Sequence, residues 1–181
     1  VRAEKDARGV QSNPIMASML KSVDDSFGRI LDALDKAGLA ENTIVIFMSD
    51  NGMTTGGSGR PGQDLAPGYP FFNAGMKGLK GSTDEGGVRV PFLIRLKGTI
   101  TAGKEIDRIA SHIDVLPTLA ALAGATLPEN QVEGRSLLPL LEGQGADWAD
   151  RYLFNHVCRW PSGAEPDDFR EVNFAVRNQK Y

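Results

Sequence analysis

The chain has 181 residues, of which 41% are hydrophobic and 24% charged, and its formal net charge is -3 at pH 7. This composition is typical of a globular protein with one substantial core, or with one domain and part of another. The negative charge, and the lack of a basic cluster interleaved with aromatic residues, argue against a nucleic-acid-binding protein. No apolar stretch approaches the length of a membrane span, so we also expect no membrane partner.

The two ends and the single cysteine bear on where the protein works. Cys158 has no partner for an internal disulfide, which leaves a secreted or periplasmic location open. Residues 1–8 are polar and do not resemble a signal peptide. The sequence starts without Met and stops inside an expected strand. We therefore interpret the chain as a fragment of a longer protein.

A long amphipathic helix is predicted from Pro14 onwards. Apolar residues recur at intervals of three and four, and polar residues fill the opposite face; the apolar positions are Ile15, Met19, Val23, Phe27, Ile30 and Leu34. Gly38 stands where a left-handed C-terminal cap belongs. A helix followed closely by an apolar strand, here Thr43–Met48, is typical of half a βαβ unit.

Two oxygen-bearing side chains, Asp50 and Asn51, follow that strand and precede Gly52. In open α/β sheets, ligands lie beyond the carboxyl ends of parallel strands, which is where these side chains would stand. A carboxylate and an amide carbonyl are hard donors that suit calcium or magnesium rather than zinc or copper. The alternative is a simple turn, because all four residues of Ser49–Gly52 favour turns.

A glycine-rich stretch from Gly52 to Gly78 leads to a second candidate site residue. A loop this long without periodicity is typically functional or disordered. Lys80 lies between Gly78 and Gly81, so little shields its ammonium from a ligand, and a lysine can neutralise oxyanion oxygens without fixed geometry. From the residues alone, Lys77 is an equally good candidate. A turn at 85–87 and a second strand, Val90–Leu96, follow.

The remaining elements are shorter. Asp114 is predicted to cap a helix over Val115–Ala123, which has Pro117 in its first turn and ends at Gly124. One helical turn is expected at Leu137–Leu141. Short strands are expected at 151–156 and 174–177. Because helices are scarce after Gly143, we predict two parts, residues 1–142 in an α/β domain and residues 143–181 in a small antiparallel subdomain.

The other titratable residues carry a structural interpretation. His112 precedes the capped helix, where a hydrogen-bonded structural role is favoured over a ligand role. His156 could face a cleft or a neighbouring strand, and both alternatives stay open. The pair Asp167 and Asp168 follows Pro166, which favours a surface turn over a carboxylate pair.

Four segments together resemble the sulfatase family of the alkaline-phosphatase superfamily, and they cover most of the chain. These segments are Ile44–Gly52, Gly78–Pro91, Ser111–Gly124 and Val132–Gly143. Each is a moderate signal alone and a strong one in this order and spacing. The resemblance implies the C-terminal half of a large mixed sheet flanked by helices, followed by a small antiparallel subdomain.

The resemblance also implies roles for three residues. Asp50 and Asn51 match two ligands of a single calcium ion, and Lys80 matches the lysine that contacts the sulfate and stabilises the leaving oxygen. Relatives with two zinc ions typically have histidine in the second position, so Asn51 favours a sulfatase over a phosphatase. The family nucleophile is a formylglycine made from a cysteine in a Cys-x-Pro/Ala-Ser-x-Arg pattern. Cys158 does not match it, because Pro161 comes one place too late and no arginine follows.

These observations predict a fragment of a sulfuric ester hydrolase that is inactive alone and self-associates. The expected substrate is a small sulfate ester or a sulfated saccharide, and the parent protein is expected to be periplasmic or secreted. Two alternatives stay open. One is a phosphodiesterase or phosphonate hydrolase of the same superfamily, and the other is a non-catalytic scaffold that retains the fold.

Overall fold

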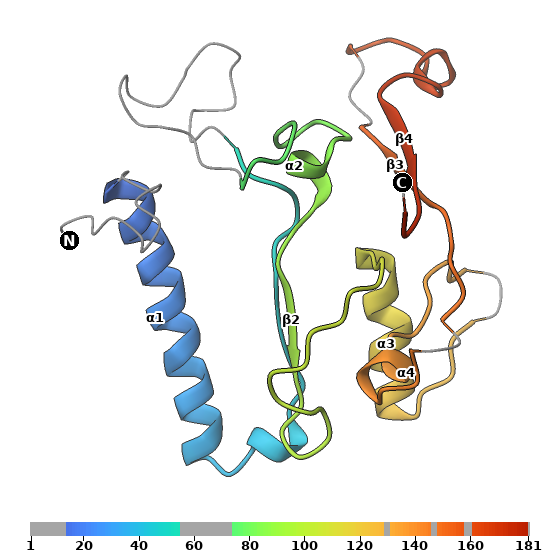
Figure 1. Cartoon of the computed structure of the whole chain (residues 1–181). Coiled ribbons are helices and arrows are strands. Elements are labelled where there is room, and N and C mark those ends of the chain that lie inside the picture. Colours follow the sequence, from blue (N-terminus) through green and yellow to red (C-terminus); the bar gives the residue numbers. More distant parts are fainter. Residues whose placement is uncertain (1–13, 55–73, 129–130, 146–147, 158–160, 181) are drawn as a thin grey trace. The chain divides into compact units, whose positions relative to one another are not determined.

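The computed structural model describes residues 14–54, 74–128, 131–145, 148–157 and 161–180 (Figure 1). These residues form a mixed α/β chain of short strands and helices. The chain divides into two compact units, one made of residues 1–96 and 156–174 and the other of residues 97–155 and 175–181. The domain boundary expected at residue 143 stays a prediction.

The first unit begins with the predicted helix, α1 (Pro14–Lys36). Gly38 ends it in the left-handed region, at φ 69°, and the Leu39 N–H donates to the Leu34 carbonyl at 3.0 Å, as in a glycine-capped helix end. The apolar stripe is only partly covered. Phe27 meets Phe47 edge to face, with 5.2 Å between ring centroids. Other apolar side chains of α1 are 49–61% exposed, namely Met19, Val23 and Ile30 of the stripe and the adjacent Leu20.

A short 3₁₀ turn, η1 (Ala40–Asn42), links α1 to strand β1 (Val45–Met48). The second strand is β2 (Phe92–Arg95), and the two pair with Val45 opposite Arg95 and Met48 opposite Phe92. Both strands are shorter than predicted, because only these residues take part in pairing. The pairing is antiparallel, and the parallel partner strand expected for β1 in a βαβ unit stays a prediction. The end of β1 therefore lies beside the start of β2.

Between the strands lies a single helical turn, α2 (Glu85–Val88), where the sequence predicted only a turn. Most of the glycine-rich stretch, residues 55–73, lies outside the described residues. Among the residues described, this sheet consists of β1 and β2. The large mixed sheet expected from the resemblance is therefore not seen in this part of the chain.

The second unit is built around the predicted helix α3 (Val115–Ala123), which ends at Gly124 with φ 66°. A 3₁₀ turn, η2 (His112–Asp114), precedes it, and the predicted helical turn α4 (Leu138–Leu141) packs against it. The buried apolar side chains of this unit come from these two helices and the residue before α4; they are Ala120, Leu137, Leu140 and Leu141. Among the described residues, Ala40 is the one further member of the buried hydrophobic core.

Strands β3 (Leu153–His156) and β4 (Phe174–Arg177) form a second two-stranded sheet. The Val157 N–H donates to the Asn173 carbonyl at 3.0 Å. This bond places the end of β3 beside the start of β4, as in an antiparallel pair. The short strands predicted for this part of the chain are confirmed, with β3 starting two residues later than expected.

Candidate functional site

Asp50 and Asn51 lie directly after β1, where the chain leaves the sheet. Asp50 is exposed and Asn51 is partly buried. The Ser49 hydroxyl donates to the Asn51 main-chain carbonyl at 3.0 Å and approaches the Asp50 carboxylate at only 3.5 Å. Ser49 thus shapes a turn, and the Asp50 carboxylate keeps nearly all its capacity for a ligand.

Gly52 brings this turn into contact with α2. Its N–H donates to the Gly87 carbonyl at 2.8 Å, and a Cβ on Gly52 would overlap the Gly86 carbonyl oxygen. Gly86 and Gly87 are themselves buried. Only residues without side chains allow two main chains to approach this closely. Because Gly52 has no side chain, its main chain can contact Gly86 and Gly87 and so join the segment after β1 to the segment before β2.

Lys80 is tied to the same turn through its main chain. Its N–H donates to the Met53 carbonyl at 2.8 Å, and Figure 1 shows the segment after β1 running beside the α2 region. The structure therefore brings together the backbone segments that carry all three candidate residues, although Lys80 follows Asp50 and Asn51 by 29 to 30 positions in the sequence. Their chemical roles stay predictions.

The two candidate lysines differ in their surroundings. The Lys77 ammonium pairs with the Asp84 carboxylate at 3.0 Å. Lys80 is exposed, and no described residue forms a hydrogen bond or an ion pair with its ammonium. An unpaired ammonium is available to an anion, whereas a paired one must first leave its carboxylate. The structure thus favours Lys80 over Lys77 as an anion ligand.

The donor chemistry of Asp50 and Asn51 fits part of a calcium site. Both supply hard oxygen atoms, and no described residue bonds to the side-chain amide of Asn51. No group of three or more acidic, histidine or cysteine residues gathers within the described ranges. Calcium takes six to eight oxygen ligands, so these two residues could hold the ion only together with donors from elsewhere in the complete protein.

The other residues considered from the sequence have the following surroundings. His156 places Nε2 at 3.0 Å from the Phe169 carbonyl and 2.8 Å from the Val172 carbonyl, so it organises the loop after β3. Asp167 and Asp168 are exposed in a 3₁₀ turn, η4 (Pro166–Phe169), as predicted for a surface turn. His112 is exposed at the start of η2. Cys158 lies outside the described residues.

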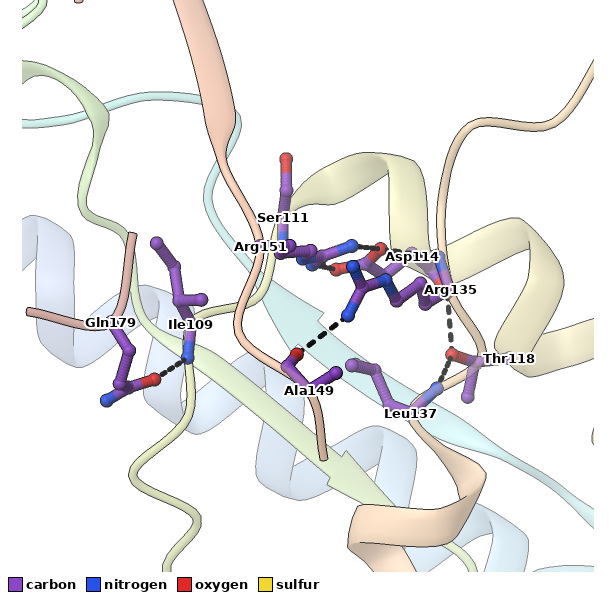
Figure 2. Close-up of polar contacts among 9 residues, drawn as sticks. All are labelled: Ile109, Ser111, Asp114, Thr118, Arg135, Leu137, Ala149, Arg151 and Gln179. Carbon is purple, nitrogen blue, oxygen red and sulfur yellow. Dashed lines mark hydrogen bonds and ion pairs between the residues drawn. The ribbon is translucent and has the colours of Figure 1, made fainter. Parts of the chain in front are cut away.

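A buried polar cluster in the second unit was not predicted. Asp114 is fully buried and does not cap α3 with its side chain, which corrects the predicted capping role. Its two carboxylate oxygens accept hydrogen bonds from both terminal nitrogens of Arg151, from the Ser111 N–H at 2.7 Å and from the Arg135 N–H at 2.9 Å. Figure 2 shows these groups converging on Asp114 from three separate segments.

The same cluster extends to α4. The Thr118 hydroxyl, also buried, donates to the Asp114 carbonyl at 2.6 Å and accepts from the Leu137 N–H at 2.8 Å. Burial alone would raise the pKa of Asp114, but the hydrogen bonds from Arg151, Arg135 and Ser111 lower that pKa below its usual value. We assign this cluster to folding, because every carboxylate oxygen is used internally. An arginine opening the predicted strand was the only sequence signal for it.

Comparison with known proteins settles the family. The sulfatase family model matches residues 6–125, about two thirds of the chain. The chain belongs to the sulfatase family. A second model, for the C-terminal region of N-sulphoglucosamine sulphohydrolase, matches residues 80–181 of this sulfatase chain.

Curated relatives agree with this assignment. Human steryl-sulfatase is 37% identical over 157 residues, which are 86% of this chain and 26% of that protein. Human arylsulfatase A is 39% identical over an alignment of 183 positions, which covers 99% of this chain and 31% of that protein. The sulfatase chain thus spans between a quarter and a third of the length of these relatives.

Solved structures extend the likeness to the fold. Ps i-CgsB in complex with k-i-k-neocarrahexaose is 36% identical, with a TM-score of 0.60 over 77% of this chain and 29% of that one. BT4656, in complex with its substrate D-glucosamine-2-N,6-O-disulfate, is 28% identical, with a TM-score of 0.54 over 88% of this chain and 28% of that one. A phosphonate monoester hydrolase of Agrobacterium radiobacter is also 28% identical, with a TM-score of 0.56 over 84% of this chain and 27% of that one.

None of the helices in the described ranges combines the length and the apolar character that a membrane span requires.

Proposed function

We propose that this chain supplies one wall of a calcium-dependent sulfate-ester site in a sulfuric ester hydrolase. The observation that carries the proposal is the pair of main-chain hydrogen bonds, from Gly52 to Gly87 and from Lys80 to Met53, both 2.8 Å long. They hold the turn with Asp50 and Asn51 against the loop with Lys80, whose ammonium is unpaired among the residues described.

Each residue has a distinct task in this proposal. Asp50 and Asn51 donate oxygen ligands to the calcium ion, and Lys80 neutralises charge that develops on the ester oxygens during bond cleavage. When bound, calcium polarises the sulfate group and orients it for attack. The formylglycine nucleophile and the remaining calcium ligands come from parts of the complete protein beyond these 181 residues.

Sulfated saccharides are the substrate class we favour over other sulfate esters. BT4656 was solved with a disulfated glucosamine described as its substrate, and Ps i-CgsB was solved with a neocarrahexaose. A phosphonate or phosphodiester hydrolase is the second candidate, because a phosphonate monoester hydrolase shares the fold over 84% of this chain. The third is a non-catalytic scaffold.

The deciding experiment compares wild-type and Lys80→Ala forms of the full-length protein on an aryl sulfate, an aryl phosphate and a phosphonate monoester. We expect the sulfate to be the best substrate, and Lys80→Ala to lower its kcat by roughly 10² to 10³, the effect of removing one oxyanion donor. Preference for the phosphorus esters would favour the second candidate. No turnover of any ester by the wild-type protein would favour the scaffold.

The proposal extends to the isolated chain. In the full-length protein, β1 and β2 belong to a larger mixed sheet, and a periplasmic or secreted location suits the parent. The isolated 181 residues should be inactive and should self-associate, because the apolar stripe on α1 is left exposed. Turnover by this chain alone, or a clean monomer at high concentration in light scattering, would contradict these expectations.

A further inference from the structure

The loop that presents Lys80 has an unequal charge balance. Residues 77–89 carry three basic and two acidic side chains, namely Lys77, Lys80, Asp84, Glu85 and Arg89. Asp84 pairs with Lys77 at 3.0 Å, and Glu85 pairs with Arg89 at 3.5 Å. Both acids of the loop therefore have a basic partner, and Lys80 is the base left over among the residues described.

The main chains of Asp84 and Lys77 are both held by hydrogen bonds within the loop, but their side chains differ in exposure. The Gly86 N–H donates to the Lys77 carbonyl at 2.7 Å and the Gly87 N–H to the Asp84 carbonyl at 2.9 Å. A Cβ on Gly78, whose φ is 79°, would lie 2.6 Å from the Asp84 Cβ. The side chain of Asp84 is 35% exposed, and that of Lys77 is 85% exposed. The Lys77 ammonium thus reaches a partly buried carboxylate from the solvent side.

We propose that Lys77 is a counter-ion for Asp84 that keeps Lys80 free to bind the sulfate group. An unpaired carboxylate in a partly buried position attracts a nearby cation more strongly than it would in water. Without Lys77, the Asp84 carboxylate would compete with the substrate anion for Lys80, four residues away. Lys77 then acts as a positioning residue, and the two lysines that look alike in the sequence have different tasks. This inference rests on the function proposed above for Lys80.

The test uses the full-length protein and inorganic sulfate as the probe, with its inhibition constant and the KM of an aryl sulfate as readouts. Lys77→Met should weaken sulfate binding about fivefold, which corresponds to ~1 kcal/mol. The double variant Lys77→Met/Asp84→Asn should return to within about twofold of wild type, because the competing carboxylate is gone. Asp84→Asn alone should bind sulfate no more weakly than wild type.

Two control variants separate this role from general effects. Lys77→Arg keeps the charge and should behave as wild type. Lys21→Met removes another exposed lysine from its 2.8 Å pair with Asp25 on α1, and it should leave sulfate binding unchanged. Thermal midpoints of all variants should match, because an exposed ion pair contributes little to stability.

Several outcomes would overturn the counter-ion role. These are unaltered sulfate binding in Lys77→Met, a double variant that stays as weak as the single one, or a Lys77→Arg variant that is as weak as Lys77→Met. The Lys80→Ala variant distinguishes the two levels of the proposal. If Lys80→Ala keeps wild-type activity, the proposed site itself is wrong. If Lys80→Ala loses activity but the Lys77 variants do not differ from wild type in sulfate binding as predicted, only the counter-ion role is wrong.

Discussion

Asp50 and Asp114 are both aspartates at the edge of a regular element, and their surroundings are opposite. Asp114 is fully buried and accepts hydrogen bonds from Arg151, Arg135 and Ser111. Asp50 is exposed, and the contact described for its carboxylate is a 3.5 Å approach by its neighbour Ser49. The Asp114 carboxylate is fully hydrogen-bonded within the fold, whereas the Asp50 carboxylate is available to a ligand.

The difference shows how side-chain bonding separates a structural acid from a candidate ligand. A buried carboxylate must find partners within the chain, because leaving it unpaired costs far more than its hydrogen bonds contribute. A carboxylate that is to bind a metal must keep its oxygens free until the ion arrives. Around Asp50 the chain instead uses main-chain contacts, through Gly52, Gly86 and Gly87, to hold the loop in place. Four substitutions test this contrast.

The largest expected effect is on stability, from Arg151→Met. The variant leaves the Asp114 carboxylate buried without its charge partner, which typically costs ~3–5 kcal/mol. Urea denaturation of the full-length protein measures the loss. The matched control is Arg95→Met, which breaks a 3.7 Å pair with Asp35 at partly exposed side chains and should cost less than ~1 kcal/mol. Equal losses of unfolding free energy in the two variants would show that the buried Asp114 carboxylate depends on its arginine no more than an exposed one does.

Asp50→Ala should affect activity rather than stability. Removing a calcium ligand from the full-length protein should lower kcat for an aryl sulfate by roughly 10²-fold or more, and it should also weaken calcium binding measured by isothermal titration calorimetry. Asp167→Ala, at an exposed acid of η4, is the control and should leave both quantities unchanged. Unaltered calcium affinity in Asp50→Ala would return this segment to the simple-turn interpretation.

Gly52→Ala tests the main-chain contact beside Asp50. The added Cβ overlaps the Gly86 carbonyl, so the segments after β1 and before β2 must separate. We expect this separation to cost ~1–3 kcal/mol of stability and to lower kcat/KM for an aryl sulfate. Gly28→Ala provides the comparison, because Gly28 lies exposed in α1 with open space around it. That helical substitution should stabilise the protein by up to ~1 kcal/mol. Full activity in Gly52→Ala would show that the close approach does not position the site.

The smallest effect is the pH dependence that Asp114 brings to stability. Its pKa is lowered in the folded state, so the ionised form is favoured by folding. The resulting stabilisation is fully present above the unfolded-state pKa of about 3.9 and is lost as the pH falls through the lower folded-state pKa. Unfolding midpoints measured from pH 6 downwards should therefore drop below about pH 4. Asp114→Asn should remove this part of the acid sensitivity, and a variant with the same pH profile as wild type would contradict the assignment.

Much of the local structure could be predicted because it depends on nearest neighbours along the chain. The spacing of apolar residues predicted α1, and Gly38 and Gly124 were predicted to end α1 and α3. In the structure both glycines adopt left-handed conformations there. The positions of β1 and β2 followed from their apolar runs, but their antiparallel pairing did not. Strand pairing depends on which segments meet in space, and no local pattern in this sequence specifies that.

The sequence by itself determined the elements, the family resemblance and the short list of Asp50, Asn51 and Lys80. Only the tertiary structure decided which of two similar lysines is paired, because the partner Asp84 lies across a loop closed by main-chain hydrogen bonds. It also decided that Asp114 belongs to the core, through an arginine 37 residues away. The physical reason is the same in both cases. Propensity and periodicity are properties of a segment, whereas the bonding of a charge depends on every segment that folds around it.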